Sequence, residues 1–160
     1  MPAVQTGTEL YASTLSWDPT RPPATILCCV DGRWFHHMQE FVQTRLGAGR
    51  RTDFLAVPGG VEPLTLFDLI PKDFNFFRRR IQALVKAHGT TRLIAIAHQD
   101  CAWYKELKLG PFTLDLRQRQ LKDLRRAASK LKDMFPDVAV ETYYARLSGE
   151  QPPRVVFETV

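Results

Sequence analysis

The sequence predicts an α/β domain with a mainly parallel central β-sheet flanked by helices. Short apolar runs alternate with segments of helical periodicity along the chain, an alternation typical of parallel sheets that are covered on both faces. Hydrophobic residues make up 44% of the chain and charged residues 24%, as in an ordinary globular protein. The length of 160 residues accommodates one domain with a substantial core.

The expected strands are short runs rich in aliphatic and aromatic residues. They cover residues 25–30, 53–57, 93–98, 138–144 and 154–158. The last of them follows a loop rich in proline and polar residues, so it could return antiparallel at an edge of the sheet.

The expected helices lie between these strands and are bounded by glycine or proline. One covers residues 34–46 and stops at Gly47, a second covers 72–88 and stops at Gly89, and a third covers 113–135. The segment before the first strand has no strong period, although Tyr11, Leu15 and Trp17 are spaced for a short helix. We therefore divide the chain into an N-terminal arm, residues 1–23, and a single α/β domain, residues 24–160.

A Cys-x-Asp-x-Arg triplet follows the first strand. If the extended backbone persists, Cys29, Asp31 and Arg33 project to one side, because side chains alternate along a strand. Such a row combines a thiolate, a carboxylate and a fixed positive charge. The Asp31–Arg33 pair would also serve as a structural ion pair in a turn, which is the preferable interpretation if the cysteines are ignored.

A His-x-x-Cys motif, His98 and Cys101, follows the strand at residues 93–98. Buried cysteines are common without any ligand, so neither cysteine is informative alone. Together Cys29, His98 and Cys101 make a Cys₂His set, which binds Zn²⁺ and leaves a fourth position for water. Because the ligands are far apart in the sequence, the site must be assembled by the fold, and we predict a zinc-binding domain.

The two motifs resemble the zinc site of the β-class carbonic anhydrases, in residue type, order and spacing. Gly59-Gly60 falls where that family has a glycine-containing turn, and the resemblance covers about residues 24–160. It implies the β-carbonic-anhydrase fold, a zinc ion on Cys29, His98 and Cys101, and reversible hydration of CO₂ to bicarbonate by zinc-bound hydroxide. It also implies a homodimer or higher oligomer in which the N-terminal arm embraces a neighbouring subunit.

The resemblance assigns catalytic roles to Asp31 and Arg33. The Asp31 carboxylate would accept a hydrogen bond from the nucleophile and orient it, and Arg33 would keep Asp31 ionised and in place. Asp31 could instead bind zinc directly and close the site, since the family shows both states. His36 and His37 begin the following helix and are candidates for proton relay.

The sequence departs from the family pattern around these motifs. Gly32 replaces a small polar residue, Ala102 replaces a glycine, and Ala56-Val57-Pro58 replaces a polar stretch. The apolar Val57-Pro58 would suit another small heterocumulene, such as carbonyl sulfide or carbon disulfide, as the substrate of a zinc hydrolase. A third alternative is a non-catalytic zinc-binding homologue.

Composition limits the kinds of binding partner that we expect for this protein. The net charge of +5 is modest, and the basic segments lack interleaved aromatics, so we expect no nucleic-acid partner. No apolar run approaches bilayer length, so we expect no membrane partner. The N-terminus shows no targeting pattern and three cysteines make no disulfide framework, so we expect a cytoplasmic protein. The resemblance implies that it is a lyase acting on a small molecule.

Overall fold

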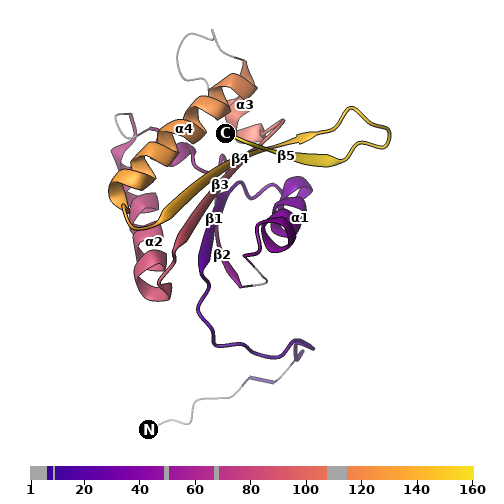
Figure 1. The fold of residues 1–160 in the computed structure, drawn as a ribbon, viewed down its shortest axis with the longest axis vertical. Coiled ribbons are helices and arrows are strands. Elements are labelled where there is room, and N and C mark those ends of the chain that lie inside the picture. The colour runs from indigo at the N-terminus through magenta and orange to yellow at the C-terminus, as the bar shows by residue number, and fades with distance from the viewer. Residues whose placement is uncertain (1–6, 9, 49–50, 67–68, 108–114) are drawn as a thin grey trace.

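The computed structural model describes residues 7–8, 10–48, 51–66, 69–107 and 115–160. One sheet of five strands in the order β2-β1-β3-β4-β5 runs through the middle of the molecule (Figure 1). The strands are β1 Ala24–Cys28, β2 Thr52–Ala56, β3 Arg92–His98, β4 Ala139–Leu147 and β5 Val155–Thr159. The first four are parallel, and β5 pairs antiparallel with β4 at the edge. The predicted fold class and the antiparallel edge strand are confirmed.

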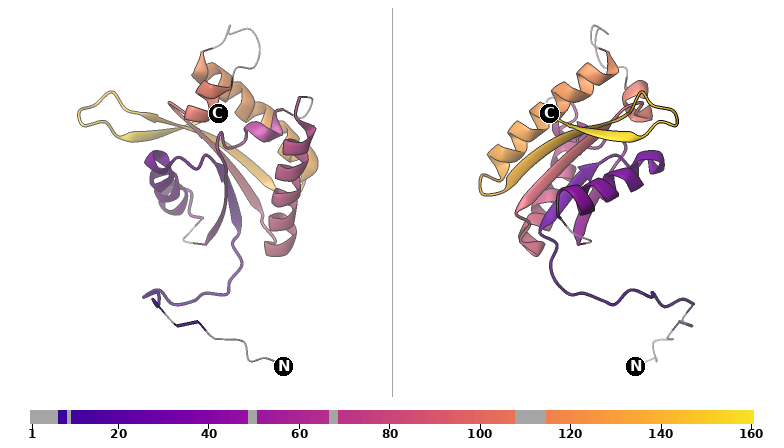
Figure 2. Two further views of the ribbon diagram at one scale, coloured as in Figure 1. Left: turned by 180° about the vertical axis from the view of Figure 1, so that it is seen from behind. Right: turned by 45° about the vertical axis from the view of Figure 1, so that its right-hand side comes forward.

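Helices cover both faces of this sheet, with α2 and α4 on one side and α1 on the other (Figures 1 and 2). Their bounds are α1 Gly32–Glu40, continued by a π-helical turn η1 Phe41–Arg45, a 3₁₀ turn η2 Glu62–Leu64, α2 Pro71–His88, α3 Ala102–Glu106 and α4 Leu116–Met134. Gly89 ends α2 in the left-handed conformation, at φ 66°, as its position after the apolar period predicts. The Asp115 carboxylate caps the start of α4 by accepting from the Gln118 backbone N–H at 2.7 Å.

The alternation along the central strands divides the core into two layers. Leu27 of β1 and Leu93 of β3 face α2 and α4, in a cluster with Phe77, Ile81 and Leu124. Their neighbours along the strands face α1, in a second cluster that contains Ile26, Cys28, Ile94, Trp34 and Met38. Cys28 is therefore a core residue and points away from Cys29, as the alternation predicts.

The short helix predicted within the N-terminal arm is wrong. Residues 10–23 have no helix and lead away from the sheet (Figure 1). Leu10 is 98% exposed and Trp17 is 89% exposed. So short a segment gains too little from helical hydrogen bonds when no surface packs against its apolar side chains.

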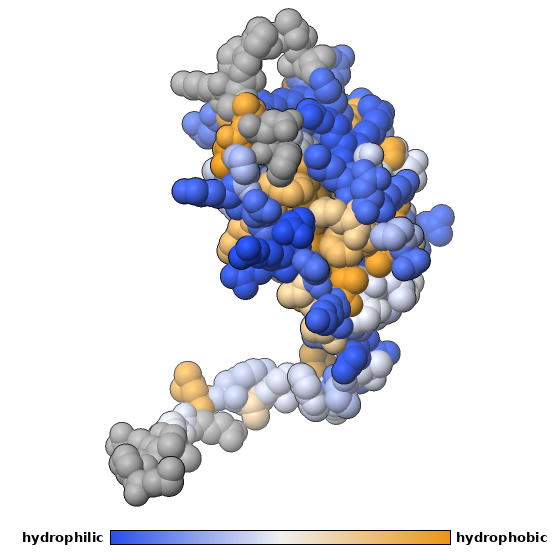
Figure 3. Space-filling view, turned by 90° about the vertical axis from the view of Figure 1, so that its left-hand side faces the viewer, coloured by the Kyte–Doolittle hydropathy of each residue, from blue (hydrophilic) through white to orange (hydrophobic). Residues whose placement is uncertain are grey.

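The face formed by α2 and α4 is predominantly hydrophilic (Figure 3). Arg79 and Arg80 of α2, and Arg125 and Arg126 of α4, are exposed on these helices. In the described part of the chain, no helix combines the length and hydropathy that a bilayer span requires.

Candidate metal centre

The two motifs meet at the carboxyl ends of the two central parallel strands. Cys28 pairs with Ile96 in the β1–β3 register, so Cys29 follows the end of β1 while His98 is the last residue of β3. Cys101 follows three residues later, immediately before α3. Neighbouring parallel strands end at the same edge of a sheet, so the topology brings together residues 72 positions apart, Cys29 and Cys101.

The three candidate ligands form a compact buried group. The Cys29 and Cys101 Sγ atoms are 4.0 Å apart, and all three ligand atoms lie within 4.8 Å of one another. Two sulfurs bound to one tetrahedral zinc at about 2.3 Å would be about 3.8 Å apart. The sulfur separation therefore fits a shared zinc ion and is too long for a disulfide.

His98 presents one ring nitrogen to this group. Its Nδ1 lies 2.8 Å from the carbonyl oxygen of Gln99, and because a carbonyl can only accept, Nδ1 carries the proton. Nε2 is thus an acceptor, and it is buried without a hydrogen-bond partner among the described residues. Buried polar atoms rarely remain unpaired, so this orphaned acceptor fits a metal ligand.

The Cys29 and Cys101 side chains are in hydrogen-bonding contact through their Sγ atoms. The contact with Cys101 is the main cause that lowers the pKa of Cys29 to about 4. The same contact, together with burial, raises the pKa of Cys101 well above its ordinary value. A bound cation would favour the thiolate form of both cysteines and displace their protons.

Asp31 and Arg33 form an ion pair beside this group, by a different route from the one predicted. The strand ends at Cys28, and Asp31 is the N-cap of α1, where its Oδ1 accepts from the Arg33 backbone N–H at 3.0 Å. The expected extended row is therefore wrong. The helix cap instead turns the Arg33 side chain back onto Asp31, with Nε to Oδ1 at 3.0 Å and Nη2 to Oδ2 at 2.6 Å.

This pair keeps Asp31 ionised. The side-chain hydrogen bonds from Arg33 are the largest cause that lowers the Asp31 pKa to about 2. Arg33 also faces Asp100, with Nη1 3.7 Å from Oδ2. Asp100 is also paired with Lys105, so its negative charge lies between two positively charged side chains.

Sequence reasoning missed the residues that support His98. The Trp34 ring lies 5.1 Å from the His98 ring, and the Gln120 amide donates to the His98 carbonyl at 2.9 Å. The Tyr144 hydroxyl donates to the Gln120 side-chain oxygen at 3.2 Å. The sequence does indicate that Gln120 is buried, because it lies four residues after Leu116 and four residues before Leu124 on one face of α4. A polar side chain on a buried face needs a hydrogen-bond partner.

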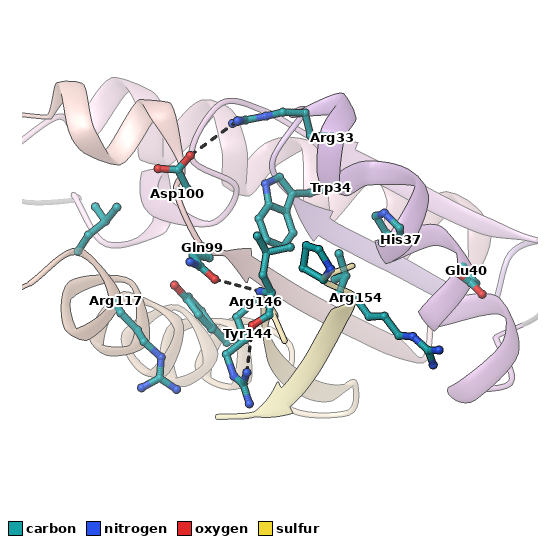
Figure 4. A pocket seen from close by; sticks show the side chains of 14 residues that line it. Arg33, Trp34, His37, Glu40, Gln99, Asp100, Arg117, Tyr144, Arg146 and Arg154 are labelled. Carbon is teal, nitrogen blue, oxygen red and sulfur yellow. Dashed lines mark hydrogen bonds and ion pairs between the residues drawn. The ribbon is translucent and has the colours of Figure 1, made fainter. Parts of the chain in front are cut away.

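An open cavity of about 1020 Å³ adjoins the site between α1, the start of α4 and the β4–β5 hairpin. Figure 4 shows Arg33 reaching toward Asp100 at its edge, with Trp34 and His37 projecting from α1. In the described part of the chain its lining includes neither His36 nor the three candidate ligands. The proton-relay role predicted for these histidines stays a prediction.

The family model described as "Putative carbonic anhydrase" matches residues 21–152, which include both motifs and the whole parallel sheet. The chain belongs to the β-carbonic anhydrase family. The fold agrees: the β-carbonic anhydrase isoform I of Trichomonas vaginalis superposes with a TM-score of 0.54 at 11% identity, over 92% of this chain and 88% of that chain. The predicted family is thereby confirmed.

Two other solved β-carbonic anhydrases are more distant in shape. That of the fungal pathogen Aspergillus fumigatus is 17% identical, with a TM-score of 0.45 over 86% of this chain and 76% of that chain. One of the two tetrameric enzymes of Sordaria macrospora is 12% identical, with a TM-score of 0.44 over 86% of this chain and 81% of that chain. Among curated protein sequences, none matches this chain.

Proposed function

We propose that this β-carbonic anhydrase family member binds one zinc ion per chain through Cys29, His98 and Cys101 and hydrates CO₂ reversibly. The orphaned, buried Nε2 of His98 beside two sulfurs 4.0 Å apart is the observation that carries the proposal. When bound, zinc supplies the Lewis acidity that makes a water molecule nucleophilic near neutral pH. Residues of the chain would hold the metal and orient the water molecule.

In this proposal Asp31 orients the nucleophile. Its carboxylate is ionised over the whole working range and lies next to the candidate ligands, where it can accept a hydrogen bond from water. Arg33 pairs with both carboxylate oxygens of Asp31 and would hold that side chain in place. Consistent with that role, the candidate ligand group in the described residues consists of Cys29, His98 and Cys101, without Asp31.

The structure reduces the case for a different heterocumulene as substrate. Val57, whose apolar side chain was the reason to consider carbonyl sulfide or carbon disulfide, packs against the core cluster under α2 and α4. Val57 therefore contributes to the core of the domain. Of the Val57-Pro58 pair, this leaves only Pro58 as a candidate apolar residue for the site. CO₂ is the substrate that we favour, and a non-catalytic zinc protein is the alternative to be tested.

The deciding experiment combines metal analysis with stopped-flow CO₂ hydration on wild type and Asp31→Asn. Asp31→Asn should retain zinc and lose activity by a factor of about 10²–10⁴, the usual effect of removing a positioned acid–base group. Asp133→Asn, an exposed aspartate at the end of α4, serves as the matched control and should leave activity unchanged. Zinc without any CO₂ hydration in wild type would establish the non-catalytic alternative instead.

We further propose that the protein is a cytoplasmic homodimer or a multiple of it. The phenylalanine-rich segment at residues 54–77 gives this little support, because Phe74 and Phe77 are buried within their own chain. Stronger support comes from the N-terminal arm, whose Leu10, Tyr11 and Trp17 are exposed and would be covered by a neighbouring subunit. The three free cysteines suit a reducing compartment.

A further inference from the structure

The turn between β2 and η2 lies against both motifs of the metal centre. A hydrogen bond joins this turn to the end of β1: the Val57 N–H donates to the Cys28 carbonyl at 3.1 Å. The Gly60 N–H then closes the turn on the Val57 carbonyl at 2.9 Å. Gly59 and Gly60 have φ values of 80° and 64°, in the left-handed region that other residues enter at a cost.

One side of the turn rests on the backbone that carries Cys29. A Cβ added to Gly60 would lie 3.2 Å from the Cys28 carbonyl carbon and 3.2 Å from the Cys29 nitrogen. The peptide that precedes Cys29 is therefore in close contact with the turn. A backbone hydrogen bond from Gly59 to the Cys29 sulfur also helps to lower the pKa of that thiol.

The other side of the turn rests on Trp103, two residues after Cys101. A Cβ on Gly59 would lie 2.3 Å from Trp103 Cδ1 and 2.9 Å from Nε1, far inside van der Waals contact. The indole ring thus packs directly on the glycine backbone. The turn is held between the Cys29 segment and the helix that follows Cys101.

The Glu62 carboxyl group makes a side-chain hydrogen bond with the Trp103 indole. The Glu62 side chain is buried, with 3% of the residue exposed, and its Oε1 has no hydrogen-bond partner among the described residues. Burial is the largest cause that raises the Glu62 pKa to about 7, and the contact with the Trp103 side chain opposes that rise. The other charged groups that face Glu62 are Asp123 and Arg119 of α4 and Asp73 of α2.

We propose that Trp103 is a positioning residue of the metal centre. Anchored by Glu62, its indole holds the Gly59–Gly60 turn against the Cys28–Cys29 peptide, and this keeps the Cys29 sulfur directed at His98 and Cys101. The consequence for metal binding rests on the zinc site proposed above. The contacts of Trp103 with the turn, and of the turn with the Cys28–Cys29 peptide, do not depend on zinc.

The test measures how fast iodoacetamide alkylates Cys29, mapped by mass spectrometry, in protein as purified and after treatment with a chelator. Trp103→Ala should raise the rate by at least about tenfold in both samples, because the turn loses its support. Trp103→Phe keeps a ring against Gly59 and should restore the rate to within about threefold of wild type. Trp17→Ala, an exposed tryptophan in the N-terminal arm, is the control and should change nothing.

A pair of glycine variants separates the contact of Trp103 with Gly59 from general destabilisation of the fold. Gly59→Ala forces a methyl group into the indole, whereas Gly89→Ala suffers the same kind of backbone strain, at φ 66°, with nothing within 4 Å. Gly59→Ala should expose Cys29 to alkylation and Gly89→Ala should not. Equal alkylation rates in these two variants, or a Trp103→Ala rate within about twofold of wild type, would overturn the proposal.

The zinc content and the rate of zinc release to a chelator are measured on the same samples. Trp103→Ala should release zinc about 10–100 times faster than wild type, the usual effect of losing an outer-shell support. Wild type that contains no zinc would defeat the proposed function, while the alkylation rates would still decide the role of Trp103. Zinc release unchanged in Trp103→Ala would overturn that role even with the metal site intact.

Discussion

Gln120 offers the most direct test of how the fold supports His98. Its side chain is 1% exposed and makes two hydrogen bonds, as donor to the His98 carbonyl at 2.9 Å and as acceptor from the Tyr144 hydroxyl at 3.2 Å. Gln120→Leu keeps the approximate size and removes both bonds. It leaves a buried carbonyl and a buried hydroxyl without their partner, since His98 and Tyr144 are each 1% exposed.

The expected loss of stability follows from these two groups. Each orphaned buried group costs about 1–3 kcal/mol, so the pair costs about 2–6 kcal/mol. Burying leucine in place of an amide returns about 1 kcal/mol. The free energy of unfolding should therefore fall by about 1–5 kcal/mol, with about 3 kcal/mol as the central value. For a urea slope of about 2 kcal/mol per molar, the unfolding midpoint should move down by about 1.5 M.

The assay is urea unfolding followed by far-ultraviolet circular dichroism, with the zinc content of every sample determined because bound metal adds stability. Gln118→Leu is the matched control, on the same helix but exposed, and should stay within about 0.5 kcal/mol of wild type. If Gln120→Leu unfolds at the same urea concentration as Gln118→Leu, the reasoning about His98 support is refuted.

Three further predictions concern the metal, a buried acid and assembly. Cys101→Ser should reduce zinc to less than about a third of an equivalent per chain by elemental analysis, and unchanged zinc would contradict the ligand assignment. Glu62 has its pKa raised to about 7, so the folded state favours its protonated form and stability is lost as pH rises from the unfolded value near 4.5 through about 7. Glu62→Gln should therefore be more stable than wild type at pH 8 and similar to it at pH 4, as measured by thermal unfolding; a variant less stable than wild type at pH 8 would contradict this assignment. Light scattering at micromolar concentration should give a dimer mass or a multiple of it, and deletion of residues 1–23 should shift the mass toward a monomer; a monomeric wild type would refute the assembly.

The sequence by itself determined the fold class and the candidate ligand set. The runs at residues 25–30 and 93–98 are continuous and apolar because their strands are central and buried on both faces, so they can be recognised locally. Each run ends in residues that a buried strand does not need, namely Cys29 in one case and His98 with Cys101 in the other. Parallel strands end at one edge, so the meeting of these residues follows from the fold class alone.

Only the tertiary structure decided how the surrounding residues act. Asp31 and Arg33 form their ion pair because α1 begins at Gly32, with Asp31 as its N-cap. The sequence pattern had instead predicted that Cys29, Asp31 and Arg33 project to one side of an extended strand. Whether a residue caps a helix or continues a strand depends on packing beyond its immediate neighbours, and local pattern does not contain that information.

The same limit applies to the supports of the site. The contacts of Gln120 with His98, and of Trp103 with Gly59, join segments whose distance and angle are set by the packing of α3 and α4 on the sheet. A residue such as Gln120 can be noticed as polar on an inward face, but its partner cannot be named before the helix is placed. Periodicity specifies which face of an element is buried, and the assembled core specifies what that face touches.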